Sequence, residues 1–172
     1  MTSFLDLAAA RYSVRDFRPD PIPEDDLAKI LESARIAPSA KNTRPHRIYV
    51  LRSEEALAKV RSLTPCAFNA PTVLLIGFDT ERECKTQRLG GRRFGEADAA
   101  IVTTHMMLCA WDLGIGSCYV GWFDPAQVRE AFGLPETVQL TGMLPIGYAA
   151  DGVVPNERHT VLRPHEETIA YL

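Results

Sequence analysis

The sequence predicts a single domain that combines α-helices with β-strands, and three stretches carry this prediction. Residues 97–113 contain no Asp, Glu, Lys or Arg between Asp98 and Asp112, and this run is too long for an ordinary strand, so we expect a buried helix. Residues 24–37 place apolar side chains at the spacing of an amphipathic helix. Residues 71–78 form a continuous apolar run, which is typical of a strand buried on both faces.

The size and charge of the chain narrow its range of partners. Its 172 residues favour one domain over residues 1–172 and can bury a sizeable core. A net charge of −3 and a pI of about 5.8 give no indication of nucleic acid or an anionic membrane surface as a partner. No signal peptide is visible, and the four cysteines show no C-x-x-C spacing. We therefore expect a cytoplasmic protein with reduced cysteines, and a disulfide pair is the alternative.

The apolar helix at residues 97–113 needs more cover than one small domain offers. It is shorter than the roughly 18 to 20 uncharged residues that span a bilayer, and two threonines and a histidine interrupt it, so we expect protein rather than lipid around it. A second subunit would supply that cover. Glycines end the helix, and residues 117–122 are strand-prone. The tail, residues 149–172, lacks a core of its own, so we expect that it lies on a partner subunit.

The N-terminal stretch combines a helix start with a basic segment. Ser3 and Asp6 match a capping box with Asp in place of Glu, which predicts a short helix running towards residue 10. In the segment that follows, Arg11, Ser13 and Arg15 share one side if the backbone is extended. Two guanidinium groups flanking a hydroxyl suit a phosphate monoester, and the alternative interpretation is a solvated basic edge.

A polar loop, residues 37–46, separates the amphipathic helix from a strand predicted at residues 47–51. Loops held by rigid neighbours concentrate binding groups. Asn42 offers donors and an acceptor suited to the edge of a heterocycle, or it caps its own backbone. His46 could stack on a ligand or titrate near neutral pH, and the alternative is an ordinary surface histidine.

The second half of the chain continues with helices, loops and strands. We expect helices at residues 54–63 and 124–132, and a strand around residues 143–148, where Pro145 favours a sheet edge or a bulge. Residues 79–95 are polar and contain glycines, but they lack the dinucleotide-binding pattern G-x-G-x-x-G. We interpret this segment as a mobile loop or a lid.

Patterns for a nucleophilic triad, a metal-ligand cluster or a phosphate-binding loop are missing, so we expect that a bound cofactor carries any difficult chemistry. Four motifs resemble, in order, those of the FMN-dependent nitroreductase family, and the resemblance extends from about Arg11 to about Glu167. It implies an α+β fold with a central, mostly antiparallel sheet flanked by helices, in an intertwined homodimer with two FMN sites at the interface. The motifs are Arg11-x-Ser13-x-Arg15, Ala37-Pro38-Ser39-Ala40-Lys41-Asn42-x-x-Pro45, Asp98-Ala99-Ala100 with Leu113-Gly114-Ile115-Gly116-Ser117, and Leu144-Pro145-Ile146-Gly147-Tyr148.

The resemblance also implies roles for single residues around the FMN phosphate. Arg11 and Arg15 would pair with the phosphate and Ser13 would donate a hydrogen bond to it. Arg163, in a stretch similar to the basic C-terminal motif of the family, would join them, and Arg158 is a further candidate.

Other residues are implied to surround the flavin ring. The Val120–Gly121 backbone would face the N5 and O4 edge, where an N–H donor stabilises the reduced ring. The sequence departs from the family at Arg44-Pro45-His46, where Gln-Pro-Trp is frequent, so the aromatic neighbour of the flavin is altered. The residues expected to line the isoalloxazine ring and the ribityl chain, mainly from the other subunit, are Pro38, Ser39, Ala40 and Asn42.

The implied activity is a ping-pong transfer of two electrons from NADH or NADPH, through FMN, to a small acceptor such as a nitroaromatic or a quinone. No catalytic side chain and no metal are expected. The alternative is a flavin-binding dimer that acts as a carrier or sensor without nicotinamide turnover. The basic residues of the segment 79–95 indicate either a substrate side that is open or favours anionic acceptors, or a solvated loop. They are Lys85, Arg88, Arg92 and Arg93.

Overall fold

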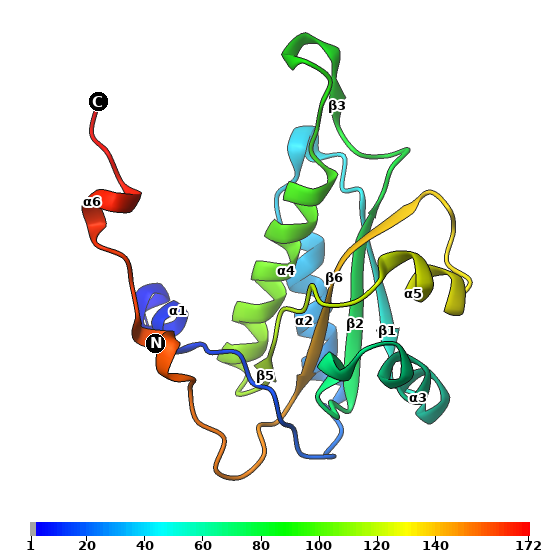
Figure 1. Cartoon of the computed structure of the whole chain (residues 1–172), viewed down its shortest axis with the longest axis vertical. Coiled ribbons are helices and arrows are strands. Elements are labelled where there is room, and N and C mark those ends of the chain that lie inside the picture. Colours follow the sequence, from blue (N-terminus) through cyan, green and yellow to red (C-terminus); the bar gives the residue numbers. More distant parts are fainter. Residues whose placement is uncertain (1–2) are drawn as a thin grey trace.

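Four strands form a central sheet in the computed structural model, which describes residues 3–172 (Figure 1). Their order across the sheet is β1-β2-β6-β5, and all neighbouring strands are antiparallel. The antiparallel sheet implied by the resemblance is therefore confirmed. The strands are β1 (His46–Leu51), β2 (Thr72–Asp79), β5 (Gly116–Ser117) and β6 (Val138–Gly147).

Helices cover both faces of this sheet (Figure 1). α2 (Glu24–Ile36) and α4 (Gly95–Asp112) pack on one face, and α3 (Glu54–Leu63) and α5 (Pro125–Ala131) pack on the other. All four helices begin and end within about two residues of the predicted bounds, which is the usual uncertainty of a helix end.

β2 is buried on both sides because each face of the sheet has its own helical layer. Leu74 and Ile76 point into the core beneath α2 and α4, whereas Val73 and Leu75 point into the core beneath α3 and α5. All four side chains are fully buried. Since successive side chains of a strand alternate between its faces, a strand covered twice has a continuous apolar sequence.

The expectation of a sheet edge at Pro145 is corrected by the structure. β6 is an inner strand: Pro145 pairs with Val73 of β2, and its carbonyl accepts a hydrogen bond from the Cys118 amide at 3.2 Å. The ladder between β5 and β6 stops at Ile146, so the proline that cannot donate lies just past the end of that ladder. The alternative expectation, a bulge, is met elsewhere in the same strand: between Ile76 and Gly77 of β2 the register shifts, and Thr141 of β6 is the extra residue without a partner.

The segment expected to be a loop, residues 79–95, contains a small hairpin. Its strands are β3 (Lys85–Thr86) and β4 (Arg92–Arg93), and a short 3-10 helix, η3 (Gln87–Leu89), lies between them. The two glycines that follow η3 have φ angles of 68° and 76°. Glycine adopts this left-handed conformation without steric cost, which explains the Gly-Gly pair at the turn.

The remaining elements are short. α1 (Phe4–Ala10) begins at Ser3, whose Oγ accepts a hydrogen bond from the Asp6 amide at 3.2 Å, so the predicted helix start is confirmed. The others are η1 (Ala40–Asn42), η2 (Pro65–Ala67), η4 (Glu157–Thr160) and α6 (His165–Thr168).

α4 is covered by the sheet and by α2, but not on its outward side. Ala99, Val102 and Met106 are fully buried, whereas Ile101 is 37% exposed and Thr104 is also exposed. One side of this apolar helix therefore faces outward in a single chain. This is the side for which the sequence predicts cover by a second subunit.

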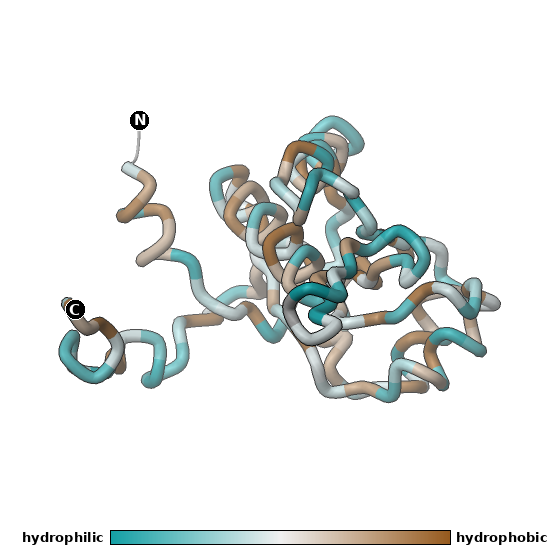
Figure 2. Tube along the Cα trace, turned by 90° about the horizontal axis from the view of Figure 1, so that it is seen from above, coloured by the Kyte–Doolittle hydropathy of each residue, from teal (hydrophilic) through white to brown (hydrophobic). Residues whose placement is uncertain are grey.

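α1 and the tail, residues 149–172, project from the rest of the chain (Figures 1 and 2). Both carry exposed apolar side chains: Phe4 is 67% exposed, Leu162 is 85% exposed and Tyr171 is 90% exposed. The placement of the tail on a partner subunit stays a prediction. Across residues 3–172, the helices are all too short or too polar to cross a membrane.

Candidate functional site

The segment that follows α1 runs in extended form beside β5. Ser13 and Ser117 form a parallel bridge, and the Val14 amide donates to the Ser117 carbonyl at 3.0 Å. Val14 is fully buried, so its neighbours Ser13 and Arg15 face the opposite way. The alternation predicted from the sequence therefore places the basic residues on the outward side.

This outward side lines a cavity of about 540 Å³. The cavity contains three guanidinium groups and one carboxylate, so its net charge is positive and it suits an anion such as a phosphate. Three of the predicted phosphate-binding residues, Arg11, Ser13 and Arg15, meet here. The complete lining is Arg11, Tyr12, Ser13, Arg15, Asn156, Glu157, Arg158 and His159.

The wall opposite these residues is the turn of η4. The Asn156 side chain caps this turn by accepting a hydrogen bond from the Arg158 amide at 3.0 Å. Arg158 thereby reaches the cavity from the C-terminal side of the chain. Arg163 lies further along the tail and is not among the lining residues, so a single chain does not bring it to the other three.

Tyr12 connects this wall to the body of the domain. Its ring centroid lies 5.1 Å from that of Trp111 and 6.2 Å from that of His159, both in edge-to-face geometry. Its hydroxyl donates to the Val153 carbonyl at 3.4 Å. Tyr12 thus holds α4, the N-terminal segment and η4 together around the cavity.

The second group of predicted residues lies in the loop between α2 and β1. The Ala40 amide donates to the Asp98 carboxylate at 2.8 Å, and Asp98 is only 2% exposed. The Ser39 hydroxyl accepts from the Arg44 amide at 3.0 Å. These two bonds fix the backbone of the loop that also carries Pro38.

The same loop contains a run of left-handed backbone. Lys41, Asn42 and Arg44 have φ angles of 50°, 56° and 49°. A non-glycine residue in this region costs of the order of 1 kcal/mol, so the loop keeps this shape only because its surroundings enforce it. Arg44 contributes to this, because its Nε donates to the Asn42 Oδ1 at 2.9 Å and its guanidinium also bonds to the Arg35 carbonyl.

α4 separates the two groups of residues. Asp98, which holds the loop, lies in the first turn of α4, whereas the strand beside Ser13 follows the last turn. α4 has 18 residues, so its ends are about 27 Å apart. Figure 1 shows the segment between α2 and β1 at the upper end of α4 and the N-terminal segment at its lower end. One chain therefore does not join the two groups into one site.

The backbone at Val120 and Gly121 is the third part of the predicted site. Val120 and Met143 exchange two backbone hydrogen bonds of 2.8 and 2.9 Å. The Val120 amide is therefore engaged within the sheet, and the expectation that the Val120–Gly121 backbone faces a flavin stays a prediction that falls on the Gly121 amide. Within residues 3–172 the Gly121 amide has no partner, and no heavy atom lies within 4 Å of the position that a Cβ would take. A ligand can therefore approach the Gly121 backbone.

Two buried polar atoms near the loop have no hydrogen-bond partner in the part of the chain that the structure describes. They are the Oδ2 of Asp98 and the Nδ1 of His46. Burial lowers the pKa of His46, the charges of Arg44 and Arg47 lower it further, and the charge of Asp98 opposes them. His46 is half-buried, so the alternative of an ordinary surface histidine does not hold.

Asp98 and Tyr12 have structural roles that the sequence alone does not predict. Asp98 is the one acid of this apolar helix that is buried, and the sequence carries no local signal for its burial, because Glu96 in the same turn is exposed. Tyr12 lies between two predicted phosphate-binding residues on the alternate face of an extended segment, and its contacts with Trp111 and His159 depend on tertiary structure alone.

Known proteins share this fold and these segments. Residues 8–67 and 58–148 match the sequence profile described as the Nitroreductase family. The chain belongs to the nitroreductase family. The resemblance seen in the ordered motifs is thereby confirmed.

Relatives of this nitroreductase family member cover almost its whole length. A protein named NADH dehydrogenase from Thermus thermophilus is 30% identical over 185 residues, which cover 88% of this chain and 89% of that protein. The crystal structure of a nitroreductase family protein from Clostridium difficile 630 superposes with a TM-score of 0.91 and 32% identity, covering 99% and 98% of the two chains. A structure from Exiguobacterium sibiricum, assigned as a nitroreductase, was solved in complex with FMN and shares the fold. It is 22% identical, has a TM-score of 0.84, and the match covers 100% of this chain and 98% of that chain.

The environment of His46 predicts how stability depends on pH. Folding lowers the pKa of His46 below its ordinary value of 6.5. At a pH between the folded and unfolded pKa values, the unfolded chain therefore binds more protons than the folded protein. The free energy of unfolding falls as the pH drops through this range. Urea unfolding between pH 7 and pH 5 should show this loss in the wild type and a shallower slope in His46→Gln. Equal slopes for the wild type and His46→Gln would contradict the assignment.

Proposed function

We propose that this protein is a cytoplasmic, homodimeric, FMN-dependent oxidoreductase that uses NADH or NADPH. The observation that carries the proposal is the separation of the two groups of predicted FMN-binding residues by α4. Each group needs the other from a second copy of the chain. In a twofold dimer, the start of α4 in one copy would lie beside the end of α4 in the other copy. Each of the two sites would then contain both groups of residues.

The outward side of α4 supports this pairing. Ile101 and Thr104 are exposed there, and Phe4, Leu7 and Leu108 line an apolar cavity of about 480 Å³ between α1 and α4. Exposed apolar surface of this kind favours contact with another protein surface. An antiparallel contact between two α4 helices would cover it and would bring the loop of one copy to the positive cavity of the other.

The chain's own residues fit FMN at three points. Arg11, Ser13 and Arg15 offer charge and a hydroxyl to a phosphate, and Arg158 adds charge from the opposite wall. The free Gly121 amide is placed to donate to an electron-rich ring edge. The loop residues Pro38, Ser39, Ala40 and Asn42 of the other copy would line the ring and the ribityl chain, and Arg163 would reach the phosphate.

Bound FMN would supply the redox chemistry by taking a hydride from the nicotinamide and passing two electrons to a nitroaromatic or quinone acceptor in a ping-pong sequence. The protein's part is to hold and orient the participants. The buried Asp98 bonds to the loop that keeps left-handed backbone, and the Gly121 amide would stabilise negative charge on the bound ring without a titratable side chain. The NADH dehydrogenase name of the Thermus relative and the FMN complex of the Exiguobacterium protein support this choice of donor and cofactor.

Anaerobic mixing tests the activity directly. The protein loaded with FMN should lose its visible flavin absorbance rapidly on addition of NADH or NADPH and regain it on addition of a quinone or a nitroaromatic. Persistent colour after both nucleotides would contradict the oxidoreductase and favour a flavin carrier or sensor. A protein that stays colourless and monomeric after FMN is supplied would contradict the whole proposal.

The phosphate contact is tested by Arg15→Ala. Loss of this guanidinium should weaken FMN binding about ten- to hundred-fold, because a charge-assisted hydrogen bond to the phosphate is lost, while thermal unfolding of the FMN-free protein stays unchanged. Arg18→Ala is the matched control. Arg18 pairs with Asp20 at 3.4 Å and lies over the Tyr148 ring, outside the cavity. An Arg15→Ala protein that binds FMN as tightly as Arg18→Ala would remove Arg15 from the site.

A further inference from the structure

The hairpin of β3 and β4 carries an unbalanced charge arrangement. Lys85 and Arg93 are directly opposite each other across the two strands, so their side chains share one face of the hairpin. Two like charges in this position destabilise a hairpin unless a negative group compensates them.

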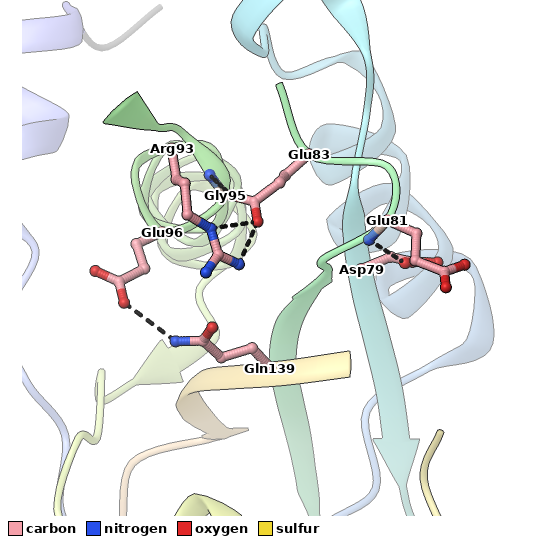
Figure 3. A network of polar contacts seen from close by, with 7 residues as sticks. All are labelled: Asp79, Glu81, Glu83, Arg93, Gly95, Glu96 and Gln139. Atoms are coloured by element: carbon pink, nitrogen blue, oxygen red, sulfur yellow. Dashed lines mark hydrogen bonds and ion pairs between the residues drawn. The ribbon is translucent and has the colours of Figure 1, made fainter. Parts of the chain in front are cut away.

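Glu83 compensates only one of these charges. Its side chain is fully buried and accepts hydrogen bonds from the Arg93 Nε at 2.7 Å and from the Gly95 amide at 3.2 Å (Figure 3). These bonds tie the hairpin to the first residue of α4. Lys85 forms no ion pair within residues 3–172, so its charge stays uncompensated.

The other carboxylates around the hairpin serve different partners. Asp79 pairs with Arg47 at 2.9 Å, and Glu96 accepts from the Gln139 side chain at 3.2 Å. Figure 3 shows that Glu81 points away from Arg93. Within residues 3–172, none of these acidic groups forms an ion pair with Lys85.

Lys85 and Arg93 line a cavity of about 850 Å³ between the hairpin and the start of β6. Its lining contains no carboxylate. The Thr80 and Thr86 hydroxyls and the Gln87 amide, beside the uncompensated ammonium of Lys85, are donors of the kind that a phosphate or a carboxylate needs, whereas the Gln139 amide already donates to Glu96. The remaining lining residues are Thr80, Thr86, Gln87, Gly91 and Gln139.

This cavity lies at the same end of α4 as the loop of the proposed flavin site. The Asp79 amide, at the end of β2, donates to the Pro45 carbonyl at 2.8 Å, and Glu83 bonds to Gly95 at the start of α4. We propose that the cavity binds the anionic group of a substrate, either a phosphate of the nicotinamide donor or a carboxylate of the acceptor. The proposal rests on the proposed function, because that function supplies both substrates.

Binding of inorganic pyrophosphate, measured by calorimetry on the FMN-loaded protein at low salt, tests the site. Lys85→Gln should weaken this binding about three- to ten-fold, since an exposed charge contributes modestly. Arg88→Gln removes the same charge from the tip of the hairpin, outside the cavity lining, and should leave the affinity unchanged. Equal affinities in the wild type and both variants would overturn the proposal.

Steady-state kinetics then identify the source of the anion. A rise in KM for NADPH but not for NADH in Lys85→Gln would assign the site to the 2′-phosphate. A rise in KM for 4-nitrobenzoate but not for 4-nitrobenzamide would assign it to the acceptor carboxylate. A wild type that is not reduced by either nucleotide would refute the proposed function, whereas a reducible wild type whose KM values match those of Lys85→Gln would refute this inference alone.

Discussion

The length and one-sided burial of α4 constrain the rest of the structure. This helix packs its inner side on the sheet, through residues such as Val102 and Met106, and it leaves its outer side apolar and uncovered. Its two ends hold the two groups of predicted FMN-binding residues: Asp98 fixes the loop at one end, and the strand after the other end aligns Ser13. A helix of about 27 Å keeps these groups apart in one chain, and the proposed twofold pairing of two such helices would bring them together.

Each group is made rigid before any ligand arrives. A buried carboxylate and a hydroxyl hold the loop in left-handed backbone that its residues would not adopt alone, and Tyr12 joins three separate segments around the positive cavity. Such preorganisation lowers the entropy lost when a ligand binds. In a cofactor enzyme the protein supplies position and electrostatics, and the cofactor supplies the reaction.

The spacing of apolar residues predicted most of the helices and β2. This spacing depends only on which sides of a helix or strand the rest of the domain covers. Contacts between distant segments could not be predicted in the same way. The hairpin at Lys85 is too short to show a strand pattern. Pro145 was predicted to lie at an edge or a bulge, because the sequence does not reveal that the neighbouring ladder stops there. In the site, the alternation around Ser13 predicted a real cavity, whereas the use of the Val120 amide by Met143 is a sheet contact without a local signal.

A heterodimer of two damaged subunits tests most directly whether each flavin site is shared between two chains. One subunit carries Arg15→Ala, and the other carries Ala40→Glu, which places a carboxylate in the loop. The two subunits are co-expressed with different tags. The mixed dimer is then isolated and titrated with FMN. If each site is built from both chains, one site of the mixed dimer contains both substitutions and the other contains neither. The mixed dimer should then bind about one FMN tightly, although each parent dimer binds FMN weakly. If instead the mixed dimer binds FMN no better than its parents, each site lies within one chain and the account is contradicted.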